Sequence, residues 1–92
     1  MDNQTNETYL NHPTFGLLYR ICLLSEEREL YTTLYAQRLF FIVTLEANRL
    51  SFNSLSRSEA RLLVENRLRT LRATGLLTEY QELQNIYRRT FQ

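Results

Sequence analysis

The sequence predicts an α+β protein: a small, strongly curved five-stranded β-barrel over residues 1–55, followed by a two-helix hairpin over residues 56–92. In the first part, short runs of β-branched and aromatic residues are separated by turn residues, which is typical of strands. In the second part, apolar residues recur at helical spacing. A chain of 92 residues is long enough for one domain with a modest core.

Five strands are expected in the first part, near residues 7–10 and at 14–24, 29–35, 37–45 and 50–53. The first strand is interrupted at residues 11–13, because Pro13 donates no ladder hydrogen bond and favours extended geometry at His12. Gly16 within the second strand indicates a bulge or a bend. Short strands joined by tight turns over about 50 residues are typical of a small curved barrel.

The stretch at residues 29–45, ELYTTLYAQRLFFIVTL, organises the sheet, and residues 36–38 are the natural break within it. Its second strand is apolar on both faces, with Leu39, Phe41, Val43 and Leu45 on one and Phe40 and Ile42 on the other. A small curled sheet buries only its inner face in itself. The outer face must therefore be covered, either by the rest of the chain or by a partner.

Two amphipathic helices are predicted, over residues 57–73 and 79–91. Ser56 followed by Glu59 has the spacing of a capping box. Gly75 is a plausible C-terminal stop for the first helix. Thr78 with Gln81 repeats the capping pattern for the second. Helices joined by so short a connection form an antiparallel hairpin.

The charge is nearly balanced, with eleven basic against ten acidic residues and a net charge of +1, and every basic residue is arginine. Residues 1–55 carry four arginines against six acidic residues, a net −2, and residues 56–92 carry seven against four, a net +3. No global field therefore favours nucleic acid or a membrane. Arginine suits protein interfaces, because it stacks on aromatic rings and binds carboxylates bidentately.

The pattern also favours a cytoplasmic protein without membrane segments. The polar residues 1–8 lack the pattern of a signal peptide. The apolar run at residues 39–43 is far shorter than a membrane span. The single cysteine, Cys22, cannot form an intramolecular disulfide and fits a reducing compartment.

No residue pattern assembles an active site, so we expect a protein that is not an enzyme and binds no cofactor or metal. His12 beside a proline is read as a turn or packing residue. Cys22 between apolar neighbours is read as a small buried hydrophobe. A catalytic dyad of Cys22 and His12 remains an alternative, although the sequence marks no third residue that would orient the histidine. No cluster has metal-ligand spacing.

Two positions break the helical pattern of residues 57–73. Arg67 falls within the apolar arc, and Leu62 lies on the opposite, otherwise polar side. The structural interpretation gives Arg67 an ion pair and makes Leu62 a packing or scattered surface residue. The functional interpretation makes both contacts for a second partner.

An RNA-binding barrel is the alternative function, since small curved barrels bind RNA and exposed aromatic rings stack bases. Backbone binding needs a basic track, and the barrel half is acidic. The helical half offers one in its arginines, diluted by Glu59 and Glu65. A solvated helix face is the preferred interpretation of that stripe.

Three segments together resemble the PipX family, the PII-interacting protein X of cyanobacteria: YLNHPTFGLLYRIC, LYTTLYAQRLFFIV and SRSEARLLVENRLRTLR. The resemblance runs from about Glu7 to the C-terminus. It implies a Tudor-like (KOW-type) β-barrel followed by two helices, in agreement with the pattern of the residues.

The resemblance also implies a regulatory adaptor that moves between two partners. At low 2-oxoglutarate such proteins are held by the trimeric signal protein PII. When ATP and 2-oxoglutarate load PII, they are released and coactivate NtcA, the dimeric nitrogen regulator of the CRP family. The helices would stay free for further partners such as RNA polymerase, and no direct DNA contact is expected.

The resemblance places the partner-binding residues on overlapping barrel surface. The critical tyrosine of the LYAQRLFF run is Tyr35, and the same surface includes Glu7, Tyr9, Gln37, Arg38, Leu39 and Phe41. Tyrosine and arginine are typical anchors of protein interfaces. The structural alternative makes Tyr35 and Phe41 merely residues of the barrel.

Overall fold

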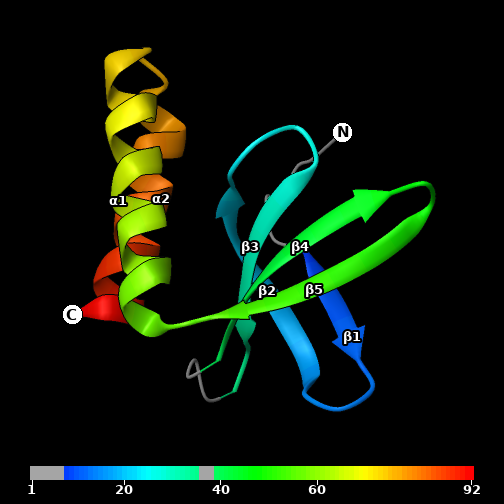
Figure 1. Cartoon of the computed structure of the whole chain (residues 1–92). Coiled ribbons are helices and arrows are strands. Elements are labelled where there is room, and N and C mark those ends of the chain that lie inside the picture. Colours follow the sequence, from blue (N-terminus) through cyan, green and yellow to red (C-terminus); the bar gives the residue numbers. More distant parts are fainter. Residues whose placement is uncertain (1–7, 36–38) are drawn as a thin grey trace.

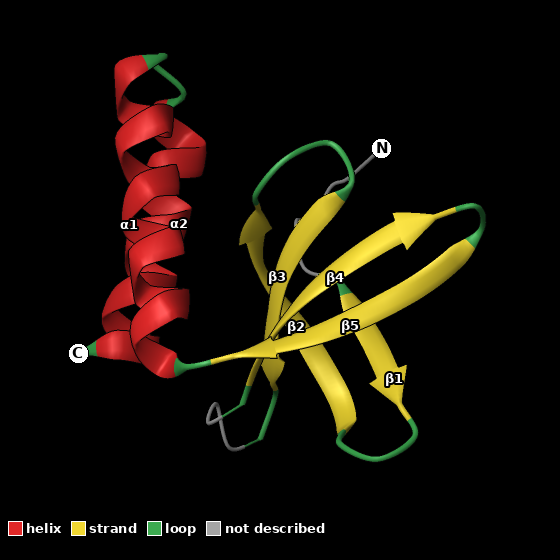
Figure 2. Cartoon of the chain, in the orientation of Figure 1, coloured by secondary structure: helices red, strands yellow, loops and turns green. Residues whose placement is uncertain are grey.

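The structure, a computed structural model, describes residues 8–35 and 39–92. It consists of an antiparallel sheet in the order β1-β2-β3-β4-β5, which curls into a half-barrel, and two helices side by side against it (Figures 1 and 2). The elements are β1 (Tyr9–His12), β2 (Gly16–Leu23), β3 (Arg28–Thr33), β4 (Phe40–Glu46), β5 (Arg49–Leu55), α1 (Arg57–Ala73) and α2 (Leu77–Phe91). The predicted α+β fold is confirmed.

The concave face of the sheet encloses one apolar cluster, formed by Leu18, Tyr31, Phe41 and Val43 with Leu10 and Phe52 packed against it. β1 and β5 are the two edges of the sheet. The ring of His12 on β1 meets Phe52 on β5 edge to face, with 5.0 Å between the ring centroids. Side chains therefore bring the two edges of the half-barrel together.

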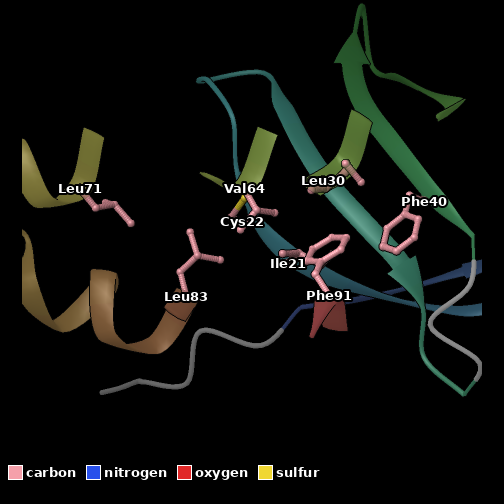
Figure 3. Packing of buried hydrophobic residues seen from close by; sticks show 9 residues of the cluster. Ile21, Cys22, Leu30, Phe40, Val64, Leu71, Leu83 and Phe91 are labelled. Atoms are coloured by element: carbon pink, nitrogen blue, oxygen red, sulfur yellow. The ribbon is translucent and has the colours of Figure 1, made fainter. Parts of the chain in front are cut away.

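The helices cover the convex face of the sheet, and a second apolar cluster fills the space between them (Figure 3). The sheet contributes Ile21, Cys22, Leu30 and Phe40, and the helices contribute Ala60, Val64, Leu71, Leu83 and Phe91. Phe40 stacks on Phe91 with 5.4 Å between centroids. The apolar outer side of β4 is thus covered at Phe40 by the chain's own helices.

The sharp turns use residues with positive φ. Ala47 and Asn48 have φ values of 48° and 64°, the pattern of a type I′ hairpin turn between β4 and β5. Gly16 has φ +77° and opens β2 directly after the turn at residues 13–15. Of the two features that the sequence allowed at Gly16, a bulge within β2 is wrong, and the positive φ instead belongs to the turn that precedes the strand. The irregularity of β2 lies between Arg20 and Cys22, where the register with β3 shifts.

Several strand ends differ from the prediction. β3 ends at Thr33, two residues before Tyr35, and β4 begins at Phe40. The N–H of Thr33 donates to Leu39 O at 3.2 Å and that of Leu34 to Leu17 O on β2 at 3.0 Å, so backbone pairing continues on both sides just past the end of β3. β1 continues to His12, and β5 extends over Arg49–Leu55.

The first helix agrees with its local pattern. The hydroxyl of Ser56 accepts from the N–H of Glu59 at 3.1 Å, and the Glu59 carboxylate accepts from the N–H of Ser56 at 2.8 Å. Gly75, with φ +76°, follows the helix end.

The predicted cap of the second helix at Thr78 is wrong. The N–H of Gly75 donates to Arg72 O and that of Leu76 to Leu71 O, the pair of bonds of a Schellman motif. Leu76 also accepts from the N–H of Tyr80 at 2.9 Å, so α2 begins one residue before Thr78. The Schellman motif fixes the chain direction, and no side-chain hydrogen bond caps α2 at Leu76.

Ser56→Ala is expected to lower the free energy of unfolding by about 1 kcal/mol, because the capping hydroxyl is lost from an N–H that has no other partner in the helix. Ser58→Ala, on the exposed first turn of α1, is the matched control and should change the free energy by less than about 0.5 kcal/mol. Urea unfolding followed by circular dichroism measures both. Equal losses in the two variants would contradict the capping role.

Candidate functional site

The connection between β3 and β4 carries the most exposed aromatic residue of the described chain. Tyr35 is 89% exposed, and Leu39 at the other end of the connection is also exposed. Leu39 O accepts from the N–H of Thr33 at 3.2 Å and from Thr32 Oγ1 at 2.8 Å. The base of the connection is therefore fixed to β3, while the Tyr35 ring projects into solvent.

Phe41, two residues after Leu39, lies on β4 and is 4% exposed. Its ring packs against Phe15, with 5.2 Å between centroids, and is nearly parallel to His12 at 6.1 Å. The Phe41 ring is consequently part of the inner cluster. It supports the start of β4 from within the sheet and does not present its face to solvent.

Tyr9 lies on an adjacent part of the convex face. Its exposed ring is tilted against Tyr19, with 5.8 Å between centroids. The register pairs Tyr9 with Tyr19 and Tyr19 with Thr32. Thr32, whose hydroxyl donates to Leu39 O, therefore lies two strand spacings from Tyr9, about 10 Å. Tyr9 and the base of the β3–β4 connection thus belong to one side of the sheet.

Three of the predicted site residues, Glu7, Gln37 and Arg38, lie outside the residues that the structure describes. Of the two helical positions, Leu62 is exposed on α1. Arg67 is half-buried and lines a groove between β2 and the helices. The salt bridges in the described part of the chain are Arg20–Glu29 and Arg61–Glu65, so the ion pair expected for Arg67 is not among them.

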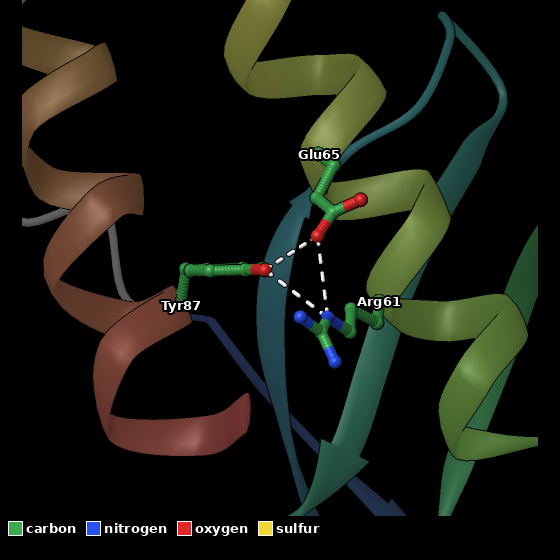
Figure 4. Close-up of polar contacts among 3 residues, drawn as sticks. All are labelled: Arg61, Glu65 and Tyr87. Atoms are coloured by element: carbon green, nitrogen blue, oxygen red, sulfur yellow. Dashed lines mark hydrogen bonds and ion pairs between the residues drawn. The ribbon is translucent and has the colours of Figure 1, made fainter. Parts of the chain in front are cut away.

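A polar contact between the helices was not expected from the sequence (Figure 4). Glu65 Oε2 accepts from the Tyr87 hydroxyl at 2.5 Å and from Arg61 Nε at 3.2 Å, and Arg61 Nε also donates to the Tyr87 oxygen. The bond from Tyr87 lowers the pKa of the Glu65 carboxyl below its ordinary value. Arg61 and Glu65 are four residues apart, which is the spacing that could have indicated the pair.

His12 and Cys22 lie on opposite faces of the sheet. His12 packs against rings of the concave side and accepts at Nδ1 from the N–H groups of Thr14 and Phe15, at 3.0 and 3.3 Å. Cys22 belongs to the cluster under the helices. The sheet separates the two side chains, so the dyad that the sequence left open is not formed.

Burial raises the pKa of the Cys22 thiol from 9.0 to about 12, although the charges of Arg67 and Arg20 oppose the shift. We expect iodoacetamide to modify the native protein far more slowly at pH 8 than the protein unfolded in guanidinium, because the thiolate is the nucleophile. Mass spectrometry of timed samples measures both rates. Equal rates would contradict the burial of the thiol.

The same shift predicts a loss of stability in alkali. The folded state holds the Cys22 proton to higher pH than the unfolded state, so the stabilisation is complete below about pH 9 and disappears as the pH rises towards 12. Burial and the hydrogen bond to Glu29 raise the pKa of Tyr31 in the same direction. Urea midpoints at pH 8 and pH 10.5 test this, and a smaller pH dependence is expected in Cys22→Ala.

Within residues 8–35 and 39–92, no three His, Cys, Asp or Glu side chains form a group that could hold a metal ion. Neither described helix is long and apolar enough to cross a membrane.

A small curled sheet with a helical hairpin, and an exposed tyrosine on a connection that is hydrogen-bonded at its base, is the architecture of a protein-interaction module. Residues 6–91 match the family described as PipX: PII-interacting protein X, which covers nearly the whole chain, so the protein belongs to this family of small regulatory adaptors. The family's name indicates the PII signal protein as a partner. No curated protein matches the chain.

Proposed function

We propose that the protein is a non-enzymatic adaptor of nitrogen control. It binds PII when 2-oxoglutarate is low. When it is released, it coactivates the CRP-family regulator NtcA. Membership of the PipX family over residues 6–91 is the observation that carries this proposal.

The geometry supports a role for the β3–β4 connection in binding. Tyr35 is an aromatic side chain with a polar tip, and it is 89% exposed in the described chain. A partner that covers it therefore gains the burial of nearly the whole ring. The bonds from Thr32 and Thr33 to Leu39 O hold the base of the connection before binding. Less ordering is then needed when a partner docks.

We assign the proposed contacts to Tyr35, Leu39 and Tyr9, together with Glu7, Gln37 and Arg38, which the structure does not describe. Phe41 has a supporting role, because its ring is enclosed by the inner cluster. Since PII and NtcA would use the same surface, the two complexes would exclude each other.

The test is a binding titration against PII in two arms, one with ADP and one with ATP, Mg²⁺ and 2-oxoglutarate. Tight binding in the first arm and its loss in the second is the expected result. Equal binding in both arms would retain the partnership and remove the metabolite switch. Absence of binding in both would contradict the PII part of the proposal, and a titration with NtcA would then decide the rest.

The RNA-binding alternative gains no support from the helical arginines. Arg61 is engaged with Glu65 and Tyr87, and the guanidinium of Arg57 lies over the Phe91 ring at 5.4 Å. A salt-dependent affinity for single-stranded RNA would be the result that revives this alternative.

A further inference from the structure

The β4–β5 hairpin ends in a pair of exposed leucines. Leu45 is 52% exposed and Leu50 is 49% exposed, and the register places them directly opposite each other. Figure 1 shows that this tip projects from the sheet on the side away from the helices. Ala47 and Asn48 form the two-residue turn, so the leucines are the first non-hydrogen-bonded pair of the ladder, in which opposite side chains lie closest. The turn therefore presents the two side chains as one apolar patch.

The leucine pair continues the inner apolar cluster beyond the part of the sheet that encloses it. Side chains alternate along a strand, so Leu45 points to the same face as Val43, and Leu50 to the same face as Phe52. Val43 is buried, whereas Leu45, two residues further along β4, is half exposed. Contiguous apolar side chains at a surface indicate a contact surface, whereas single exposed leucines do not. The apolar stripe of the concave face is thus open at the hairpin tip.

A carboxylate lies beside the leucine pair. The N–H of Leu45 donates to Glu27 O at 3.3 Å, so Glu27 lies opposite Leu45 on the side away from Leu50. Glu27 precedes Glu29 by two residues, and Glu29 points to the concave side, where it accepts from the Tyr31 hydroxyl at 3.0 Å. Glu27 is exposed, and neither salt bridge of the described residues includes it. Leu50, Leu45 and Glu27 therefore form a row across three adjacent chain segments, with about 5 Å between neighbours.

We propose that this row, called the hairpin-tip row below, is a docking site for an amphipathic helix of a partner protein. Residues one turn apart on a helix are separated by about 5.4 Å, which is close to the spacing between strands. A helix that crosses the strands therefore places its side chains i, i+4 and i+7 over the three members of the row. Two apolar side chains would cover Leu50 and Leu45, and an arginine or lysine would pair with Glu27.

The charges at this end of the sheet favour a basic helix over an acidic one. Glu26, beside Glu27 in the turn between β2 and β3, is also exposed. The two nearest arginines do not offset these carboxylates on the concave side. Arg28 is the residue after Glu27 and points to the other face. Arg49 lies directly opposite Glu46. A cationic side chain on the partner is therefore complementary to the hairpin-tip row.

The hairpin-tip row is separate from the surface proposed for PII and NtcA. Leu39, at the base of the β3–β4 connection, comes just before β4, and Leu45 lies six residues further along, or roughly 20 Å. Tyr9 lies on the convex side of the sheet, whereas Leu45 and Leu50 point to the concave side. A variant at the hairpin tip therefore leaves the proposed PII contacts unaltered. The inference does not depend on the proposed function.

The test uses the full chain and a blocked, alanine-rich helical peptide that contains Leu-Ala-Gln-Ala-Leu-Ala-Gln-Arg, titrated by ¹H–¹⁵N NMR. Saturable shifts are expected at Glu27 and at residues 44–51. Leu50→Gln should weaken binding about tenfold, because the burial of an apolar side chain is lost. Leu77→Gln changes another exposed leucine, on α2, and is the matched control that should leave the affinity unchanged.

An exchange of charges tests the contact with Glu27. Glu27→Lys should weaken binding of the arginine peptide about fivefold, because an attraction between exposed charges becomes a repulsion. A peptide with glutamate in place of the arginine should bind this variant more tightly than it binds the unaltered chain. Glu79→Lys, in the exposed first turn of α2, is the control. Glu27 is an exposed turn residue, so this variant keeps the proposal testable if Leu50→Gln weakens the hairpin, and urea unfolding of both variants measures that.

Several outcomes would overturn the proposal. These are no saturable shifts at the hairpin tip, equal losses in Leu50→Gln and Leu77→Gln, and equal binding of the arginine and glutamate peptides by the unaltered chain. Shifts at the tip that depend on the concentration of the free protein would assign the surface to a second copy of the chain. Nuclear Overhauser effects between residues 1–7 and either leucine would show that the chain covers its own patch. PII binding by Leu50→Gln is measured in parallel and should be unchanged, which separates this test from that of the proposed function.

Discussion

Phe40→Ala is expected to lower the free energy of unfolding by about 3–5 kcal/mol, a large fraction of what a small domain possesses. Phe40 is 1% exposed and belongs to the cluster that joins the sheet to the helices. Its ring stacks on Phe91 with 5.4 Å between centroids and 20° between planes. Truncation leaves a cavity between two layers that cannot both close over it.

Urea unfolding followed by far-ultraviolet circular dichroism measures the loss. Leu77→Ala is the control, since this leucine is 64% exposed at the tip of the hairpin and should cost less than about 0.5 kcal/mol. A double-mutant cycle with Phe91→Ala isolates the stack and should give a coupling of about 0.5–1.5 kcal/mol. A coupling near zero would mean that this aromatic pair does not hold the helices on the sheet.

The helices could be predicted from the sequence because their determinants are local. Ser56 and Glu59 cap α1 through groups three residues apart, and Gly75 supplies the positive φ that ends it. The prediction of a helix cap at Thr78 was wrong because it used the local composition alone. Thr78 has the composition of a cap, but the two Schellman bonds at Gly75 and Leu76 had already set the start of α2.

The sheet was predictable in its number of strands and less so in their ends. The run through Tyr35 has the composition of a strand. The end of β3 depends on its pairing with β2, and the last bond of that pairing, from the N–H of Leu34 to Leu17 O, joins residues far apart in the sequence. No local pattern contains that contact. The same holds for the bulge near Ile21, which depends on the pairing of β2 with β3.

The features of the candidate site were also predictable only in part. The resemblance to the PipX family singled out Tyr35 and supplied the partners, while the residue pattern placed Tyr35 within a strand. Two features needed the fold: the enclosure of the Phe41 ring, and the groove beside Arg67. Periodicity placed Arg67 in an apolar arc, but only the packing of α1 and α2 against β2 makes that arc the side of a groove.

Tyr35→Ala is expected to weaken the complexes with both PII and NtcA by about 2 kcal/mol or more, roughly 30-fold in the dissociation constant. The fold should be unaffected, because the ring is 89% exposed and belongs to neither core cluster. The free energy of unfolding should therefore change by less than about 0.5 kcal/mol. Isothermal titration calorimetry with each partner and a urea titration of the free protein measure the two quantities.

Two further variants separate the causes. Tyr35→Phe keeps the ring and removes the hydroxyl, so it should retain most of the affinity if burial of the ring dominates. Leu77→Ala removes another exposed apolar side chain at a distance from the β3–β4 connection, and both affinities should be unchanged. Unaltered binding in Tyr35→Ala, with native circular dichroism, would mean that the exposed ring is not the anchor. A loss confined to one partner would mean that PII and NtcA do not share this contact, and their mutual exclusion would then need a different physical cause.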